Sequence, residues 1–234
     1  SVRKMALASL SNLAKFLGLY EDWKRIVKAY GLKWSSGKAE DYLISRMAHT
    51  ENNGEVLEWV EQVKINEPRL SVFMDFMVLS GLRLREAVNS YNLIIDLAKA
   101  GRLSEYYNEE TEALEHYKFK DLFLRKSKKT FVSFAPKSLV MRIAEHGKPL
   151  NKHGVCTGIQ RYGLPLRFGD IRELHGSIMS KYLSEAEVNF LHGRIGSSVF
   201  MSNYFNIKWI NDLRERMSKG VAEIQSKLSE SPIN

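Results

Sequence analysis

The chain has 234 residues, and its 35 Lys and Arg against 27 Asp and Glu give a formal net charge of +8. A hydrophobic content of 44% excludes wholesale disorder, and the length allows one large domain or two modest ones. The lone cysteine, Cys156, excludes an intramolecular disulfide and a zinc site built from several cysteines. Without a long apolar run or a secretory leader, we expect no membrane span and a cytoplasmic location. The excess positive charge favours a polyanionic partner, although many basic proteins bind no nucleic acid.

Residues 1–34 are predicted to form two helices, the first with leucines every three or four residues from Leu7 to Leu17. Basic residues dominate this segment, although a solvated charged face is the simpler explanation for them. The helical character of the opening residues suggests a fragment of a longer protein. The polar stretch Thr50–Gly54 is the predicted linker, so we expect a helical domain over residues 1–54 and a second domain over residues 55–234.

Apolar periodicity predicts helices over residues 55–64, 69–80 and 84–100, and further helices from Ser138 and from Ile171. A last helix carries an apolar stripe from Ile207 to Leu228, which could pack on its own core or dock on a neighbouring protomer. Two β-rich runs, 117–125 and 130–134, flank the polar turn 126–129 and predict a hairpin. The predicted class is therefore mainly α with a small antiparallel β-sheet (α+β).

Three groups of basic residues are candidates for chemistry. Arg83 begins a helix, where a bound phosphate would explain it, but on this segment alone an ion pair between a surface arginine and Glu86 is the better explanation. The predicted hairpin is Lys-rich, which suits insertion into a nucleic-acid groove but also blocks edge pairing between strands. Its basic residues are Lys118, Lys120, Arg125, Lys126, Lys128 and Lys129.

The third group contains Arg172, His192, Arg194 and Tyr204. A tyrosine in an aromatic patch is usually a core residue. Together with Arg83 and a hairpin lysine, however, these residues form a coherent set for phosphoryl transfer. The tyrosine would attack a phosphodiester, the arginines would stabilise the transition state, and the lysine would protonate the leaving oxygen. Such chemistry needs no metal and no other cofactor, because the cationic side chains supply the charge stabilisation.

Taken in chain order, five segments resemble the boxes of the tyrosine recombinases, and within that family the integrases of archaeal viruses and plasmids. Residues 80–86 resemble the family's first arginine box, and residues 119–136 resemble its small sheet with the catalytic lysine. Residues 170–176 resemble the second arginine box, residues 190–194 the histidine box, and residues 198–205 the box of the nucleophile. The resemblance implies that the catalytic residues are Arg83, Lys128, Arg172, His192 and Tyr204. Glu86 would support the site, and Lys126 and Lys129 compete with Lys128 for the lysine role.

Two features depart from the family pattern. Gly169 lies three residues before Arg172, where the family usually has His or Lys, so that role is unfilled or falls to Arg167 or His175. The interval from His192 to Tyr204 is longer than in bacterial members, which leaves open whether the tyrosine acts in its own active site or a neighbour's.

The resemblance also implies the architecture and partners. Residues 1–54 would be part of a helical core-binding domain, and residues 55–234 a tyrosine-recombinase-like catalytic domain. The protein would act as a homotetramer on double-stranded DNA, associated with the host nucleoid, and integrate or excise a viral or plasmid element. A topoisomerase of type IB and a catalytically inactive DNA-binding protein of the same fold are the alternatives. The expected DNA contacts are Lys118, Lys120, Arg125, Lys126, Lys129, Arg194, Arg3 and Lys4.

Overall fold

The computed structural model describes residues 2–33, 53–125, 128–194 and 210–230. The chain divides into two compact units, residues 1–51 and 52–234, and each is described by itself. The division falls within the polar stretch that separates the two domains predicted from the sequence.

In the described part of the first unit, residues 2–33, the helices α1 (Val2–Phe16) and α2 (Tyr20–Ala29) pack against each other. Gly18, with φ 72°, allows the tight turn between them. Leu7 is the buried residue of the predicted leucine stripe, whereas Leu10 and Leu17 are about half exposed within this unit (46% and 56%). The stripe therefore forms as predicted but remains largely uncovered by the unit itself.

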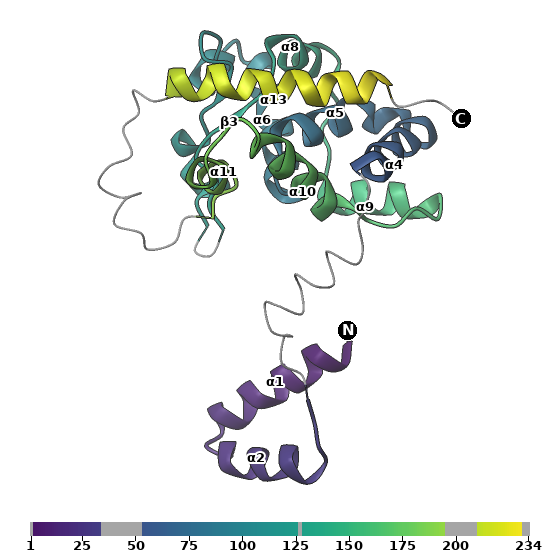
Figure 1. Cartoon of the computed structure of the whole chain (residues 1–234), viewed down its shortest axis with the longest axis vertical. Coiled ribbons are helices and arrows are strands. Elements are labelled where there is room, and N and C mark those ends of the chain that lie inside the picture. Colours follow the sequence, from purple (N-terminus) through teal and green to yellow (C-terminus); the bar gives the residue numbers. More distant parts are fainter. Residues whose placement is uncertain (1, 34–52, 126–127, 195–209, 231–234) are drawn as a thin grey trace. The chain divides into compact units, whose positions relative to one another are not determined.

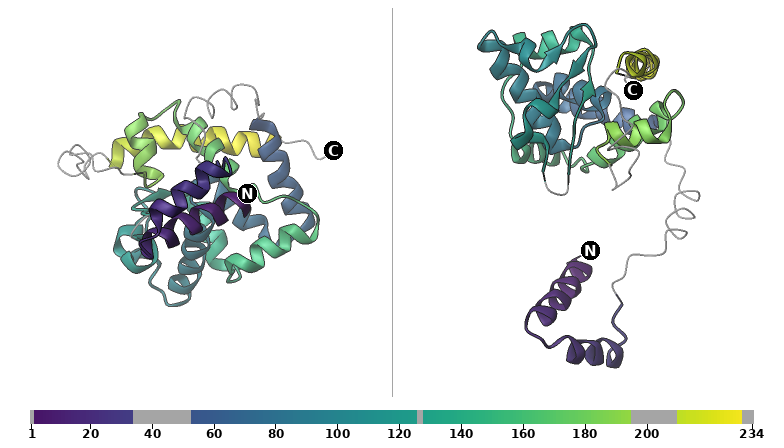
Figure 2. Two further views of the ribbon diagram at one scale, coloured as in Figure 1. Left: turned by 90° about the horizontal axis from the view of Figure 1, so that it is seen from below. Right: turned by 90° about the vertical axis from the view of Figure 1, so that its left-hand side faces the viewer.

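The second unit is built around α5 (Ser71–Ser80), whose residues Phe73, Met74, Phe76 and Met77 are completely buried. The central helix packs against five others, which explains why it is apolar on all sides. Figure 1 shows this arrangement, and Figure 2 views α13 nearly along its axis. The helices around α5 are α4 (Asn53–Asn66), α6 (Leu84–Lys99), α8 (Lys137–His146), α10 (Phe168–Met179) and α13 (Ile210–Glu230).

Shorter elements complete this unit. A small antiparallel sheet has the order β1-β2-β3, with Tyr107 paired to Leu114 and Ala113 paired to Phe134. The mainly helical class with a small antiparallel sheet is therefore confirmed. The remaining elements are η1 (Pro68–Leu70), η2 (Leu103–Glu105), β1 (Tyr107–Asn108), β2 (Ala113–Leu114), η3 (His116–Lys118), α7 (Lys120–Phe123), β3 (Ser133–Phe134), α9 (Lys152–Arg161) and α11 (Glu185–Leu191).

The predicted hairpin is wrong in its first half. Residues 116–123 form η3 and α7 rather than a strand, and the turn is closed by an isolated bridge between Leu124 and Lys129. The reason is aromatic packing: Phe119 and Phe123 lie four residues apart, so a helical turn brings both rings against Tyr106, at centroid distances of 5.3 and 6.1 Å. The alternation that suggested a strand fits this helical spacing equally well.

The last helix packs on its own unit, one of the two alternatives left open by the sequence. Leu213, Met217, Val221 and Ile224 of α13 are buried, and the helix contacts α5 and α10. Arg216 donates two hydrogen bonds to Glu187 at the start of α11, which fixes the near end of α13. In the part of the chain that the structure describes, no helix combines the length and apolar character that crossing a bilayer requires.

Candidate active site

The corner between α5 and α6 places Arg83. Gly81 ends α5 in the left-handed region, with φ 61°, and its N–H donates to the carbonyl of Met77. A Cβ at Gly81 would also collide with the imidazole of His175. Arg83 follows in an extended conformation at the N-cap of α6. Glycine is therefore required both for the turn and for the approach of α10 to this corner.

Two arginines from distant segments meet at one carbonyl. Arg83 donates to the main-chain oxygen of His192 at 3.0 Å, and Arg172 of α10 donates to the same oxygen. Arg172 also donates to the carbonyl of Gly81 at 2.8 Å. The structure thus brings together three of the predicted catalytic residues: Arg83, Arg172 and His192.

Positive charge exceeds negative charge around this carbonyl. Burial and, to a smaller extent, the neighbouring Arg83 and Arg194 lower the pKa of Arg172 to about 9, at which the group is still protonated at neutral pH. Burial also lowers the pKa of Arg83. Glu86, only 1% exposed, opposes them and forms an ion pair with Arg125. Four guanidinium groups therefore share one carboxylate, an environment that favours an anionic ligand.

Two buried imidazoles lie beside the arginines. His175 Nδ1 and His192 Nε2 are 3.1 Å apart, and the side chains are 1% and 2% exposed. Burial and the positive charge of Arg172 lower the pKa of His175 to about 3 and that of His192 to about 2. Both rings are therefore neutral at physiological pH. In the contact between them, one of the two facing nitrogens donates a hydrogen bond and the other accepts it.

Several polar atoms here are buried without a hydrogen-bond partner among the described residues. Such atoms cost free energy, so their concentration in one place makes this cluster the candidate binding site. They are Arg83 Nη1, Glu86 Oε2, Arg125 Nε, Thr130 Oγ1, His175 Nε2 and His192 Nδ1.

The basic turn spans residues 125–129, and its described residues, Arg125, Lys128 and Lys129, lie on one side of this cluster. Gly193, with φ 56°, lies so close to Lys129 that a Cβ there would collide with the Lys129 carbonyl oxygen. Phe131, just after the turn, stacks on Phe190 with ring centroids 5.8 Å apart. Together with the ion pair between Arg125 and Glu86, these contacts place a lysine-rich segment next to the arginines.

Within the basic turn, Lys128 and Lys129 are exposed, while Lys126 lies outside the described residues. Arg194 is also exposed and raises the positive potential at Arg83. Tyr204, the predicted nucleophile, lies outside the described residues. The cluster therefore contains the predicted arginines, histidine, acid and turn, without a described position for the tyrosine.

Other predicted residues lie elsewhere or have other partners. Lys120 is exposed on α7, and Lys118 forms an ion pair with Glu115. Arg3 and Lys4 belong to α1 in the other compact unit.

Arg167 and His175, the two residues that could take the role of the His or Lys missing at Gly169, lie in different surroundings. Arg167 pairs with Asp170 at 2.7 Å and approaches Glu55 at 4.0 Å. His175 instead enters the cluster. A Cβ at Gly169 would meet no heavy atom of the described residues within 4 Å.

Sequence reasoning missed a second buried network, between α6 and the sheet. Tyr106 donates to Ser90 at 2.8 Å and contacts His116 Nδ1 at 2.7 Å, and His116 Nε2 lies 2.8 Å from the Ser133 hydroxyl. Burial lowers the pKa of His116 to about 3. The partners are distant in sequence, and no local spacing connects them. The same holds for the contact of His175 with His192, although the position of His175 one turn after Arg172 was an available signal.

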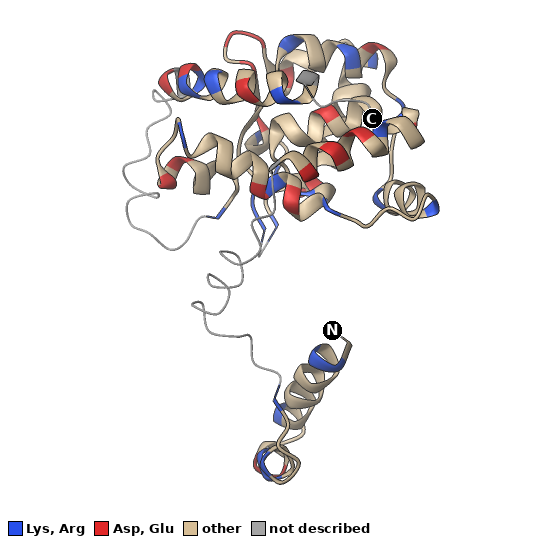
Figure 3. Ribbon diagram, turned by 45° about the vertical axis from the view of Figure 1, so that its right-hand side comes forward, with Lys and Arg blue, Asp and Glu red and all other residues tan. Residues whose placement is uncertain are grey.

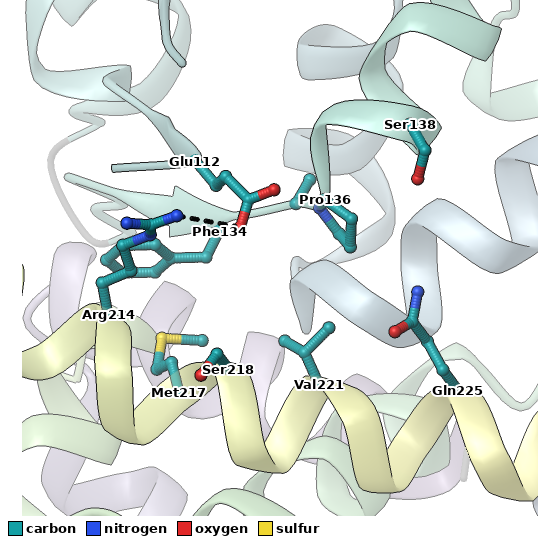
Figure 4. Close-up of a pocket in the computed structure, with 10 residues that line it drawn as sticks. Glu112, Phe134, Pro136, Ser138, Arg214, Met217, Ser218, Val221 and Gln225 are labelled. Atoms are coloured by element: carbon teal, nitrogen blue, oxygen red, sulfur yellow. Dashed lines mark ion pairs between the residues drawn. The ribbon is translucent and has the colours of Figure 1, made fainter. Parts of the chain in front are cut away.

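A separate hollow lies along α13. Its volume is about 310 Å³, and Figure 4 shows Arg214, Met217 and Val221 of α13 pointing toward Glu112 and Phe134. None of the described candidate site residues lines it. Arg214 and Glu112 face each other across it at 3.6 Å. In the described residues, no group of three or more His, Cys, Asp and Glu side chains could hold a metal ion.

Comparison with known proteins gives no assignment: no protein-family model, no curated protein and no solved structure matches this chain. The candidate site therefore depends on its own geometry and on the sequence pattern. Figure 3 shows Lys and Arg distributed along helices of both units, so the arginine cluster is distinguished by convergence and burial rather than by charge alone.

Proposed function

We propose that this chain is a site-specific DNA strand transferase of the tyrosine-recombinase type, which integrates or excises a viral or plasmid element. One observation carries the proposal. Arg83 and Arg172, far apart in the sequence, donate to the same carbonyl beside two buried imidazoles, with a basic turn seated alongside. Guanidinium groups that converge in a partly dry site are suited to the non-bridging oxygens of a phosphodiester.

In the proposed reaction, the Tyr204 hydroxyl attacks phosphorus, a phosphotyrosyl bond forms at the 3′ side, and the bond to the 5′ oxygen breaks. A lysine of the basic turn, Lys128 or a neighbour, gives a proton to that leaving oxygen. A second strand's 5′-hydroxyl then reverses the step. The unpartnered Nη1 of Arg83 offers a donor to the phosphate without breaking an existing contact.

Binding of duplex DNA would use the exposed cations around the cluster. Lys128, Lys129 and Arg194 are exposed next to the arginines, so they are suited to neighbouring phosphates. Strand exchange requires four cleavages, so the proposal includes a homotetramer on two DNA sites. Affinity should then fall steeply with salt, with a log–log slope of about −0.9 per neutralised phosphate.

The test begins by selecting duplexes that the full chain binds from a random pool. Bound sequences are rebuilt as nicked duplexes, on which a cleaved strand end diffuses away and traps the covalent adduct. We expect an adduct on a denaturing gel, with the modified peptide containing Tyr204. Tyr204→Phe should abolish it, whereas Tyr162→Phe, which alters a 45% exposed tyrosine on the turn after α9, should not. Undiminished adduct formation by Tyr204→Phe would refute the assignment.

One observation favours a second candidate, a DNA-binding protein of this type without turnover. Arg172 is only 7% exposed, and two of its five N–H groups already donate to main-chain carbonyls, so its burial limits how closely a phosphate can approach it. Salt-dependent binding to the selected duplexes without any adduct would support this candidate. Relaxation of supercoiled plasmid without site preference would instead indicate the chemistry of a type IB topoisomerase.

A further inference from the structure

The two buried imidazoles lie between two glycines. A Cβ at Gly81 would fall on the ring of His175, and a Cβ at Gly176 would come within 3.0 Å of His192 Cε1. His175 and His192 therefore fill the space left by the two missing side chains, with ring centroids 5.3 Å apart. Each ring is therefore packed against a glycine on one side and lies beside the other ring, which limits how far it can turn.

The contact between the rings uses defined atoms. His175 Nδ1 faces His192 Nε2 at 3.1 Å, and the main chain of Leu79 is a second polar neighbour of the His175 ring, whereas His192 Nδ1 has no partner among the described residues. For neutral imidazoles, one of the facing nitrogens donates and the other accepts. Loss of the His175 nitrogen would therefore leave His192 buried with both ring nitrogens unpartnered, which is unfavourable.

The same residue that His175 contacts also supplies the carbonyl shared by the two arginines. Arg83 and Arg172 both donate to His192 O, so the position of His192 decides where both guanidinium groups lie. His175 is on α10, one helical turn after Arg172, and thus reaches His192 from the same rigid element as Arg172.

We propose that His175 is a positioning residue, which acts through His192. Its Nδ1 holds the His192 ring, and through the His192 main chain it holds Arg83 and Arg172 together. It does not occupy the place beside Gly169, so its role differs from that of a general acid or base in that place. The catalytic consequence rests on the proposed function, whereas the positioning itself does not.

The first experiment reads the arrangement directly, in the full chain without DNA. Nuclear magnetic resonance of ¹⁵N-labelled protein follows the His192 ring nitrogens and the exchange of the Arg172 guanidinium protons with water. His175→Asn keeps a nitrogen near the place of Nδ1, whereas His175→Phe fills the space without one. His146→Asn, at an exposed histidine on α8, is the matched control.

We expect His175→Phe to shift the His192 ring signals and to speed Arg172 proton exchange about tenfold, the scale of one lost hydrogen bond. His175→Asn should restore most of the wild-type behaviour, and His146→Asn should leave it unchanged. A folded His175→Phe protein with wild-type signals would overturn the proposal. If His175→Phe does not fold, the His175→Asn variant decides alone. A folded His175→Asn protein whose His192 ring signals had moved to those of an imidazole without a hydrogen-bond partner would overturn the proposal.

The second experiment measures the catalytic consequence on the nicked duplexes. His175→Phe should slow single-turnover adduct formation while leaving DNA affinity nearly unchanged, because the arginines are misplaced but not removed. Equal losses in rate and affinity would overturn the catalytic part. If the wild-type chain forms no adduct, the proposed function fails, and the magnetic resonance result still decides the positioning role.

Discussion

Two buried histidine networks in the same unit differ in how completely their polar atoms are paired. In the network of Tyr106, His116, Ser133 and Ser90, every side-chain polar atom has a partner in the structure. In the arginine cluster, His175, His192 and Arg83 each retain a buried atom without one. Burial is similar, so the difference lies in pairing: a fully paired network stabilises the fold, whereas unpaired buried polar atoms cost free energy that a bound ligand could offset.

Charge separates the two networks in the same direction. The first contains neutral groups, and His116 is kept neutral by burial. The second brings Arg83, Arg125, Arg172 and Arg194 near the buried Glu86, which leaves excess positive charge at the site. Removing a residue from the first network should therefore cost stability, and removing one from the second should cost function.

The largest effect is expected from low pH, which lowers the free energy of unfolding through the histidines of both networks. Burial lowers the pKa of His116 and His175 to about 3 and that of His192 to about 2. The unfolded chain binds these protons near pH 6.5 and the folded chain does not, so the stability they confer is present above pH 6.5 and is lost as pH falls toward 3. Each group contributes a slope of about 1.4 kcal/mol per pH unit in that window.

Urea unfolding at a series of pH values measures this dependence. We expect the free energy of unfolding to fall by several kcal/mol between pH 6.5 and pH 5, on the scale of the summed slopes. Replacing His116 should reduce the steepness, because one titrating group is gone. Stability that stays level down to pH 4.5 would show that the histidines are not held neutral by burial.

Arg83→Ala should separate function from stability. The variant removes one of the two guanidinium groups at the shared carbonyl, and we expect adduct formation to slow by about 100-fold or more. The free energy of unfolding should be unchanged or higher, because a buried, incompletely paired charge is removed. Arg85→Ala, which changes an exposed arginine two residues along, is the control and should keep the rate. A large loss of stability in Arg83→Ala would assign the cluster to the fold instead.

His116→Leu should show the opposite pattern. The change leaves the Ser133 hydroxyl buried without its partner, so we expect a loss of about 2 kcal/mol in the free energy of unfolding. The rate of adduct formation per folded molecule should not change. His153→Leu, at an exposed position on α9, is the stability control. Unfolding at the wild-type urea concentration would contradict a structural role for this network.

The smallest effect is expected at the surface of the basic turn. Lys129→Ala should weaken DNA binding less than tenfold and reduce the salt slope by about 0.9, the contribution of one phosphate. Lys148→Ala, another exposed lysine in the same unit, should change neither quantity. Binding measured at several salt concentrations tests both variants, and identical slopes for all three proteins would remove the turn from the DNA interface.

The sequence predicted the helices and the corner of the site because these depend on local patterns. Regular apolar spacing gave α4, α5 and α6, and Gly81 marked the end of α5. The strand predicted over residues 117–125 failed because Phe119 and Phe123 satisfy both a two-residue and a four-residue spacing. Only the contact with Tyr106 distinguishes them, and that contact comes from a separate part of the chain.

The arginines and His192 could be predicted because they occur in recognisable short motifs. The pairing of His175 with His192, the seating of Lys129 on Gly193 and the partner of Glu86 could not, because each depends on tertiary packing. β1 and β2 are two residues each, too short to show any period within an acidic stretch.

The close approach of Gly193 to Lys129 supplies a criterion for relatives discovered later. Any side chain at position 193 would have to push Lys129 away from the segment after His192. The left-handed backbone at Gly193 adds a conformational cost for any other residue. A homologue that kept both arginines but replaced this glycine would have to hold its lysines differently. The residue aligned with Gly193 could therefore separate homologues that hold the basic turn as here from those that hold it in another way.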